Sequence, residues 1–230
     1  RRKNRNWLGD KMQKKQYAVI GMGRFGMSVA MTLVNAGQEV LVVDSDEERI
    51  QKVAEHFTHA VVVDTTDEAS FAALGIRNFD MVVVAIGHDV QASVLTTLLL
   101  KEMGVRHIVA KAANALHGKM LEKVGADQVV FPERDMGQRI AHNLMSTNII
   151  DYFELAPDLG IIEVDVRGNL VGKSLMESNL RERYGITVIA VRRNGKISLS
   201  PSPADKLAES DRLILVGDNI GIQRFEAEAC

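Results

Sequence analysis

The sequence predicts an α/β protein in which a Rossmann-like, doubly wound parallel sheet is followed by a smaller C-terminal α+β lobe. Short β-branched runs alternate with helical segments through residues 17–131, which is the rhythm of repeated βα units. These runs are continuously apolar, as in parallel strands that are buried on both faces. Residues 158–230 differ, because they contain an alternating strand and an Asn-Gly hairpin signal.

The first region contains six predicted strands with five helices between them. We expect the strands at Tyr17–Ile20, Val40–Val43, Ala60–Val63, Met81–Ile86, His107–Ala110 and Gln128–Phe131. We expect the helices at Arg24–Ala36, Glu47–Glu55, Phe71–Leu74, Gln91–Met103 and Ala115–Val124. Gly37, Gly104 and Gly125 follow three of these helices, at positions where a left-handed glycine commonly ends a helix.

A long helix is predicted at Asp135–Phe153, with Met136, Ile140 and Leu144 in one apolar stripe. One interpretation packs this stripe on the sheet as core. The other makes it a crossover or dimer helix that carries contacts between lobes or subunits. The expected domains are a basic tail at 1–15, a Rossmann domain at 16–134, a linker helix at 135–157 and a C-terminal lobe at 158–230.

The C-terminal lobe is expected to mix strands and short helices. The strands are predicted at Ile161–Val166, Ile186–Val191, Lys196–Leu199 and Arg212–Val216, and the helices at Lys173–Arg183 and Ile222–Glu228. Asn194-Gly195 predicts a tight hairpin between the second and third strands. A lobe of about 70 residues is small for a self-sufficient core, so pairing with a second copy would stabilise it.

Composition and charge exclude several classes of protein. The chain has 230 residues, of which 46% are hydrophobic and 25% charged, which excludes disorder, collagen and a disulfide scaffold. The single cysteine, Cys230, favours a reducing cytoplasmic setting. No apolar run approaches the roughly 20 residues of a membrane-spanning helix, and no apolar signal core begins the chain.

Charge is unevenly placed along the chain. Residues 1–15 hold seven Lys and Arg and one Asp, a balance of +6, so the net charge of −2 leaves −8 for residues 16–230. One interpretation makes the tail extraneous, with a natural start at Met12. The other makes it an arm that binds nucleic acid or lipid. The acidic body argues against nucleic acid as the main partner.

A glycine motif predicts the binding site. Gly21, Gly23 and Gly26 form G-x-G-x-x-G directly after the first strand and at the start of a helix. The spacing suits a tight turn, close approach of a phosphate pair and close packing of the helix, whose N-terminus favours an anion. Asp44 ends the second strand, where an acid accepts hydrogen bonds from ribose hydroxyls.

Further candidates lie where other strands end, on the edge of the sheet that binds ligands. Asp64 and Thr65 follow the third strand, and Ala85, Ile86 and Gly87 end the fourth. Ile86 and Thr65 are placed to flank a base and Gly87 to admit phosphates. The alternative is that all of these are ordinary residues between strand and loop.

Two charged residues have open alternatives. Arg24, inside the glycine motif, either binds phosphates of its own or a neighbouring nucleotide or is a solvated surface arginine. Glu133, after Pro132 at the end of strand six, is either a divalent-metal ligand or a helix-start acid, because a carboxylate beside a polyphosphate needs a cation between them. The six histidines show no metal-binding spacing, and no nucleophile elbow occurs.

Several segments together resemble the Ktr/Trk family of potassium-uptake regulatory subunits, which carry RCK domains. The segments are Ala18–Gly26, Val82–Gly87, Gln91–Ser93, Leu121–Asp127 and Pro132–Met136, and the likeness to the KtrA/KtrC type extends over about residues 16–228. The resemblance implies a non-enzymatic gating ring, an octamer built from dimers. It docks on a membrane-embedded potassium channel subunit of the KtrB/KtrD type at the inner face of the membrane.

The resemblance also implies ligands and site residues. ATP and ADP compete for the N-terminal domain, with ATP favouring the conducting state. Arg24, with Phe25 beside it in the motif, matches the arginine that reaches a neighbouring subunit's ATP, and Asp44 matches the ribose-binding acid. Glu133 matches a glutamate that binds Mg or Ca together with ATP, and Lys111 matches a lysine near the nucleotide. Ala113 stands where the family has glutamine, so no contact is carried over there.

The C-terminal lobe of relatives binds cyclic di-AMP between paired lobes, and Leu180, Arg181 and Pro203 lie in the corresponding stretch. The rival class is an NAD-dependent oxidoreductase on the same fold, since NAD(H) binds such domains and fold alone does not decide function. An oxidoreductase needs a substrate domain with an acid or base. A C-terminal lobe of about 70 residues is thin for that purpose.

Overall fold

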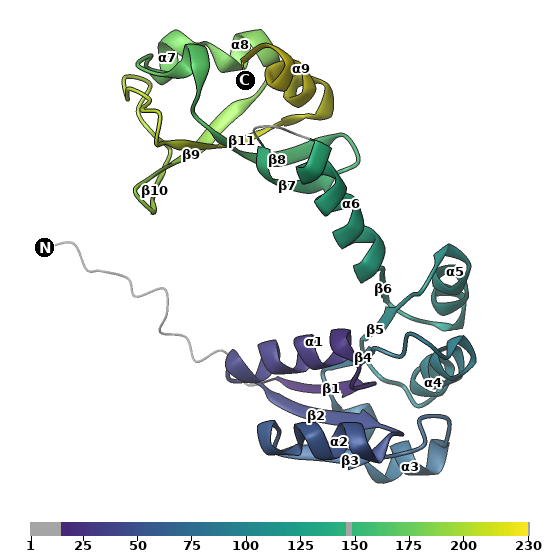
Figure 1. Ribbon diagram of the computed structural model, residues 1–230. Coiled ribbons are helices and arrows are strands. Elements are labelled where there is room, and N and C mark those ends of the chain that lie inside the picture. The colour runs from purple at the N-terminus through teal and green to yellow at the C-terminus, as the bar shows by residue number, and fades with distance from the viewer. Residues whose placement is uncertain (1–14, 146–148, 230) are drawn as a thin grey trace, which may run out of the picture. The chain divides into compact units, whose positions relative to one another are not determined.

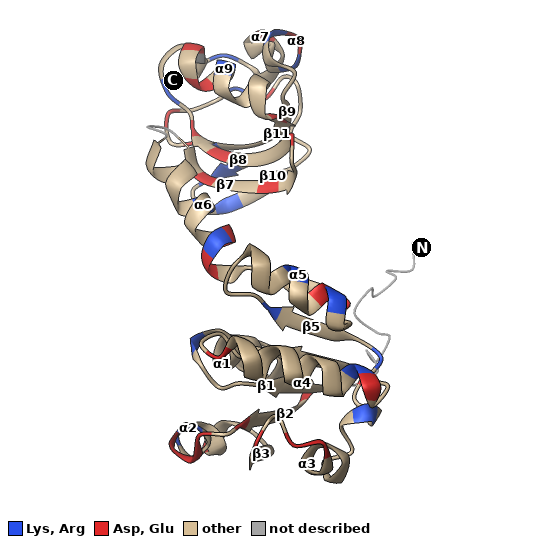
Figure 2. Ribbon diagram, turned by 90° about the vertical axis from the view of Figure 1, so that its right-hand side faces the viewer, with Lys and Arg blue, Asp and Glu red and all other residues tan. Residues whose placement is uncertain are grey.

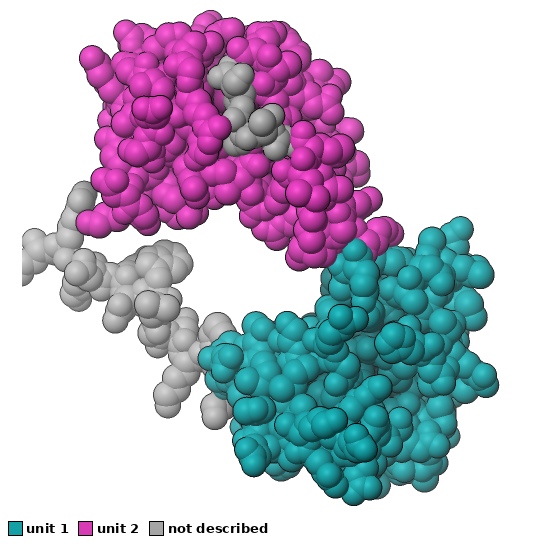
Figure 3. All heavy atoms as spheres, in the orientation of Figure 1, with its two compact units in different colours: residues 1–133 teal, residues 134–230 magenta. Residues whose placement is uncertain are grey.

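The computed structural model describes residues 15–145 and 149–229, and it divides into two compact units, Arg1–Glu133 and Arg134–Cys230 (Figures 1 and 3). The predicted start at Met12, nearly all of the basic tail and Cys230 lie outside the described residues. Each unit has its own sheet and its own core. Among the described helices, none is long and apolar enough to cross a membrane.

The first unit is built on a six-stranded sheet in the order β3-β2-β1-β4-β5-β6, and every neighbouring pair is parallel. Its strands are β1 (Gln16–Ile20), β2 (Glu39–Asp44), β3 (His59–Val62), β4 (Met81–Val84), β5 (Ile108–Lys111) and β6 (Gln128–Val130). The direction of winding reverses between β1 and β4. Loops leave the carboxyl ends of these two strands in opposite directions, and this opens a crevice.

Helices cover both faces of this sheet, as the continuously apolar strands require (Figure 1). They are α1 (Arg24–Asn35), α2 (Glu47–Val53), α3 (Glu68–Ala73), α4 (Val90–Glu102) and α5 (Ala115–Val124). Within β1, Ala18 and Ile20 join the core on the side of α3, α4 and α5, whereas Val19 joins the core on the side of α1 and α2. The doubly wound fold class is therefore confirmed.

The second unit contains a five-stranded antiparallel sheet in the order β10-β9-β11-β8-β7. The strands are β7 (Ile149–Ala156), β8 (Leu159–Asp165), β9 (Thr187–Arg193), β10 (Lys196–Leu199) and β11 (Arg212–Asp218). Helices α7 (Leu175–Ser178), α8 (Leu180–Tyr184) and α9 (Asn219–Ala229) accompany it. The predicted hairpin is confirmed: Asn194 and Gly195 have φ of 50° and 76°, as a tight two-residue turn requires.

The prediction of one long helix at Asp135–Phe153 is wrong. The helix α6 runs over Pro132–Met145, and Ile149 already belongs to β7. β7 pairs with β8 through a short turn, so Tyr152 is buried in the core while Phe153 is 54% exposed. The buried residues of β7, Ile149 and Tyr152, are three apart because the pairing register shifts between Ile149 and Asp151. The apolar stripe had continued the helical period by coincidence, and hairpin pairing outweighed it.

The helix predicted at Lys173–Arg183 is also divided. Asn179 adopts a left-handed conformation with φ of 46°, which ends α7 before α8 begins. Ser174 caps α7 through a reciprocal bond with Glu177, and this local capping box sets where α7 starts. Sequence periodicity does not detect such a break, because a single left-handed residue separates two helical segments.

Candidate functional site

The glycine loop joins β1 to α1 at the crevice. Gly21 has φ of 99°, and a Cβ there would lie 3.1 Å from the backbone of Ala85. A Cβ on Gly26 would overlap the carbonyl oxygen of Gly21, so α1 can approach the loop only with glycine at that position. A Cβ on Gly23 would meet no protein atom within 4 Å. The protein's own packing therefore requires Gly21 and Gly26, whereas the space beside Gly23 is open to a ligand.

The N-terminus of α1 has uncommitted backbone donors. Side chains cap the helices that follow the next strands: Asp46 for α2, Asp67 for α3, Asp89 for α4 and Asn114 for α5. Gly23 provides no such cap for α1, and the first turn of α1 contains no acidic residue. The first N–H groups and the positive end of the helix dipole therefore lack a carboxylate partner, which favours binding of an anion such as a phosphate.

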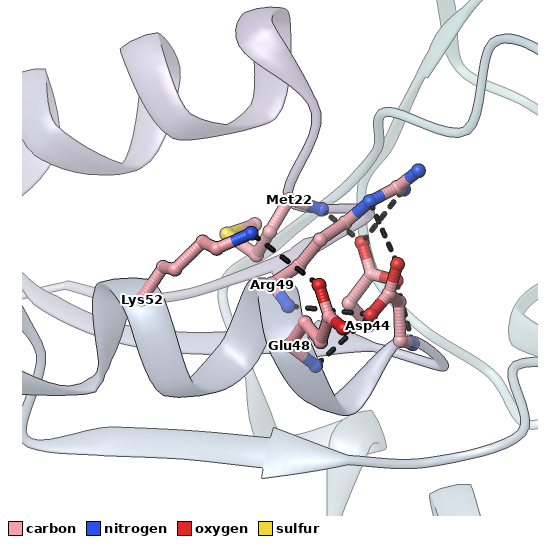
Figure 4. Close-up of polar contacts among 6 residues, drawn as sticks. Met22, Asp44, Glu48, Arg49 and Lys52 are labelled. Carbon is pink, nitrogen blue, oxygen red and sulfur yellow. Dashed lines mark hydrogen bonds and ion pairs between the residues drawn. The ribbon is translucent and has the colours of Figure 1, made fainter.

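Asp44 connects the glycine loop to the start of α2 (Figure 4). Its side chain is almost fully buried; one oxygen accepts a hydrogen bond from the Met22 N–H at 2.6 Å, and the other accepts one from the Asp46 N–H at 2.9 Å. Arg49 adds ion pairs to Asp44 at 3.4 Å and to Asp46 at 3.3 Å. Acidic residues gather around the start of α2 (Figure 2). The ribose-binding acid proposed from sequence is thus a rigid part of the loop.

Lys111 and Glu133 form an ion pair at another part of the site. The Lys111 ammonium donates to the Glu133 carboxylate at 2.6 Å and lies 5.8 Å from the centroid of the Phe25 ring. The hydrogen bond from Lys111 is the main cause that lowers the pKa of Glu133, and the charge of Arg24 adds a smaller effect. The Lys111 side chain is 13% exposed and that of Glu133 is 70% exposed. The carboxylate is therefore the accessible partner.

These features line one cavity of about 390 Å³, which is within the usual range for small-molecule sites. The cavity brings together most of the nucleotide-binding residues predicted from sequence: Gly21, Gly23, Arg24, Phe25, Asp44, Thr65, Ala85, Ile86, Gly87, Lys111 and Glu133. Gly26 and Asp64 do not line it. Gly26 packs α1 on the loop, and exposed Asp64 accepts hydrogen bonds from the Thr66 N–H at 2.9 Å and hydroxyl at 2.7 Å.

Six lining residues, each of which follows the end of a strand, were not among those predicted from sequence: Ser45, Arg49, His88, Asp89, Ala92 and Ala113. A signal existed for each of them. Ser45 follows β2, and Arg49 lies in the first turn of the next helix, so both are near the carboxyl edge of the sheet. The same reasoning applies to Asp89 and Ala92 after β4. Residues up to one helical turn beyond a strand end belong to the candidate set.

A metal site is not complete within the described part of this chain. Over residues 15–145 and 149–229, no group of three or more His, Cys, Asp or Glu is placed to hold a metal ion. Mg and Ca require six or more oxygen ligands. Glu133 fits such a site only as one carboxylate ligand, so the other ligands would come from water, from phosphate oxygens of a nucleotide or from a second copy of the chain.

The residues predicted to bind cyclic di-AMP have different environments. Leu180 is 3% exposed and belongs to the core of the second unit, whereas Arg181 and Pro203 are exposed. The Pro203 carbonyl accepts a hydrogen bond from the Met176 N–H at 2.9 Å, which ties its loop to α7. A cavity of about 450 Å³ opens beside β9 and β10, but none of the three residues lines it. The site therefore stays a prediction.

Comparison with known proteins identifies both parts of the chain. The TrkA-N domain family matches residues 17–132, and the TrkA-C domain family matches residues 159–229. The chain is 46% identical over 213 residues to Ktr system potassium uptake protein C of Bacillus subtilis, covering 93% of this chain and 96% of that protein. It is 45% identical over 218 residues to Ktr system potassium uptake protein A of the same organism, covering 95% and 98%.

Solved structures agree with the fold. The GsuK RCK domain matches with a TM-score of 0.67 at 20% identity, covering 95% of this chain and 48% of that one. An NAD(P)-binding domain of an exopolyphosphatase-related protein from Archaeoglobus fulgidus matches with a TM-score of 0.51 at 25% identity, covering 57% and 98%. The sequence matches decide the family. This chain belongs to the Ktr/Trk family of RCK proteins, the regulatory subunits of potassium uptake systems.

Proposed function

We propose that this chain is the nucleotide-reading gating subunit of a potassium channel or transporter, activated by ATP and held inactive by ADP. The observation that carries the proposal is the cavity at the switch point. An uncapped helix N-terminus, Arg24 and Lys111 line it as candidate phosphate-binding groups, and Asp44 lines it as a candidate ribose-binding acid, which supports the proposal. The family to which the chain belongs supports a regulatory, non-enzymatic role.

ATP differs from ADP by one phosphate, so discrimination depends on groups that contact that phosphate. Arg24 is exposed and lines the cavity, and it is available to a phosphate of its own nucleotide or of a neighbouring subunit's nucleotide. A ligand gates a protein only if it binds two conformations with different affinity. Moving an equilibrium from 1:99 to 99:1 takes a ratio of affinities of about 10⁴.

The test is calorimetric binding of ATP and ADP to the wild type and to Arg24→Ala. Loss of one charge-assisted hydrogen bond predicts that ATP binding weakens about tenfold or more, with a smaller loss for ADP. Arg106→Ala is the matched control, because this exposed arginine does not line the cavity. Equal losses for the two nucleotides would contradict the role of Arg24.

We propose further that a divalent cation, Mg or Ca, binds together with ATP through Glu133. Its accessible carboxylate on the cavity supports this role, and its bond to Lys111 means that the cation competes with an internal ammonium. The cation would reduce repulsion between the carboxylate and the phosphates. The test is a cation titration of ATP binding, described with the predictions below.

The remaining parts of the proposal concern partners. The chain pairs with itself, forms an octameric ring from dimers and acts at the inner face of the membrane beside a separate potassium channel subunit. Exposed apolar side chains on α6, at Met136, Ile140 and Leu144, support self-association of the helix. Light scattering with ATP and with ADP measures the ring size. Potassium flux into vesicles that hold the membrane subunit measures activation.

Cyclic di-AMP is proposed as a second ligand, bound between paired C-terminal lobes near Arg181 and Pro203. Leu180 is buried, so its part in such a site requires the surrounding helices to move. Titration of cyclic di-AMP against the wild type and Arg181→Ala tests the site.

The alternative function, an NAD-dependent oxidoreductase, predicts hydride transfer when NADH is incubated with a panel of metabolites. Binding of NADH without turnover favours the regulatory role.

A further inference from the structure

The guanidinium of Arg49 has an unusual setting at the ribose end of the cavity. It lies in the first turn of α2, lines the cavity beside Asp44 and Ser45, and makes ion pairs with Asp44 through Nη1 and with Asp46 through Nε (Figure 4). Both contacts are made through edges of the planar group. They restrict how the plane can rotate and leave its two faces free of these contacts.

The rest of the ribose end offers little flat surface to a base. The aromatic residues that line the cavity are Phe25 and His88. Phe25 lies near Lys111, and His88 lies in the loop between β4 and α4. Neither belongs to the β2–α2 connection that holds Asp44. In this part of the cavity, Arg49 is the planar group, and guanidinium planes stack well on aromatic faces.

We infer that Arg49 forms one wall of a purine slot, with its guanidinium stacked on the base while Asp44 and Asp46 hold the edge of the plane. Ile86 and the methyl group of Thr65 also line the cavity and would form another wall of the slot. The inference rests on the proposed nucleotide binding and assigns part of its specificity. Asp44 orients the sugar and Arg49 selects a flat base, while the phosphate-binding groups lie elsewhere in the cavity.

An arginine near a ribose could instead bind a 2′-phosphate, as in domains that prefer NADP. The local charges argue against this role. Two carboxylates already neutralise Arg49, and one of them, Asp44, is buried and fixed by two backbone N–H groups. A 2′-phosphate placed there would face Asp44 across a short distance, and like charges would repel.

The experiment separates the planar shape of Arg49 from its charge. Binding of ATP, CTP and inorganic tripolyphosphate is measured by calorimetry for the wild type, Arg49→Lys and Arg49→Met. Lys keeps a positive charge that can pair with the carboxylates but lacks the plane, so both variants should lose ATP affinity about tenfold, as expected for loss of one stacking contact. Their affinity for tripolyphosphate should stay within about twofold of the wild-type value, and the preference for ATP over CTP should shrink.

Lys52→Met is the matched control. Lys52 lies on the same helix, is 72% exposed, pairs with Glu48 and does not line the cavity, so its loss removes the same charge without removing a wall (Figure 4). It should bind ATP as the wild type does. If Lys52→Met weakened ATP binding as much as Arg49→Met does, general electrostatics would explain the loss of affinity, and the inference would be overturned.

The remaining outcomes are also decisive. Full ATP affinity in Arg49→Lys would assign the role to charge and reject the stacking wall. Tighter binding of adenosine 2′,5′-bisphosphate than of ADP by the wild type would assign Arg49 to a 2′-phosphate instead. Failure of the wild type to bind any nucleotide would refute the proposed function itself, and this result is distinct because it appears before any variant is compared.

Discussion

Removal of the Asp44 carboxylate should destabilise the first unit before any question of ligand binding arises. In Asp44→Ala, the N–H groups of Met22 and Asp46 lose their acceptor. Met22 is 6% exposed, so water replaces that hydrogen bond poorly. An unsatisfied buried donor costs about 1–3 kcal/mol, and water from the open cavity reduces the cost at Asp46, so the sum is about 2–4 kcal/mol.

Differential scanning calorimetry converts this figure into a measurable shift. A unit of this size loses about 4 °C in Tm per kcal/mol, so the first unit should melt about 8–16 °C lower. The second unit has a separate core, and its transition should stay in place. Asp44→Asn keeps one amide oxygen as an acceptor and should lose about half as much.

Asp64→Ala provides the control for this experiment. Asp64 follows the neighbouring strand, but its carboxylate is exposed and accepts hydrogen bonds from Thr66, so solvent takes over its role. Its Tm should change by no more than about 2 °C. A shift below about 3 °C in Asp44→Ala would refute the reasoning, because it would mean that the buried carboxylate does not hold the loop.

Three further predictions concern the cation, the glycine motif and acid stability. Glu133→Gln should remove the dependence of ATP binding on Mg or Ca. Lys111→Met should make that dependence steeper, because it frees the Glu133 carboxylate. An unchanged cation titration in Glu133→Gln would contradict the role of Glu133. Gly23→Ala should weaken nucleotide binding with little loss of Tm. Gly26→Ala should lower Tm as well, because its added Cβ overpacks the loop at a cost of about 1–3 kcal/mol. Equal Tm values for the two variants would contradict this distinction. Hydrogen bonds from Arg193, followed by the Ala208 N–H, lower the pKa of buried Asp211. The stabilisation is present above the pKa that Asp211 has in the unfolded chain and is lost as the pH falls through its lower folded value. The second unit should therefore lose stability below about pH 4. Asp211→Asn should make this loss of stability smaller in thermal melts between pH 6 and pH 3.

Much of the site followed from the order of residues along the chain. Parallel strands place their carboxyl ends on one edge, so Gly21, Asp44 and Ala85, far apart in sequence, could be assigned to one site before their distances were known. Lys111 was assigned to the same site from the family resemblance. Local patterns also predicted the Asn194-Gly195 hairpin, because its left-handed backbone depends on two adjacent residues.

Patterns could not decide contacts that depend on pairing or on side-chain direction. Ile149 and Phe153 fit a helical stripe, and only pairing of β7 with β8 showed that they belong to a strand. Arg49 reaches the cavity because two carboxylates hold it there, and Lys111 meets Glu133 because β5 and the start of α6 lie at the same edge of the site.

The sequence by itself determined the doubly wound fold, the glycine loop and the acid that ends β2, since each depends on residues close together in the chain or on the common direction of parallel strands. Tertiary structure alone decided that Glu133 is paired with an ammonium, that Asp64 lies outside the cavity and that Arg49 lines the cavity beside Asp44. The physical reason is that these three outcomes depend on side-chain contacts between separate elements. No local periodicity encodes such contacts.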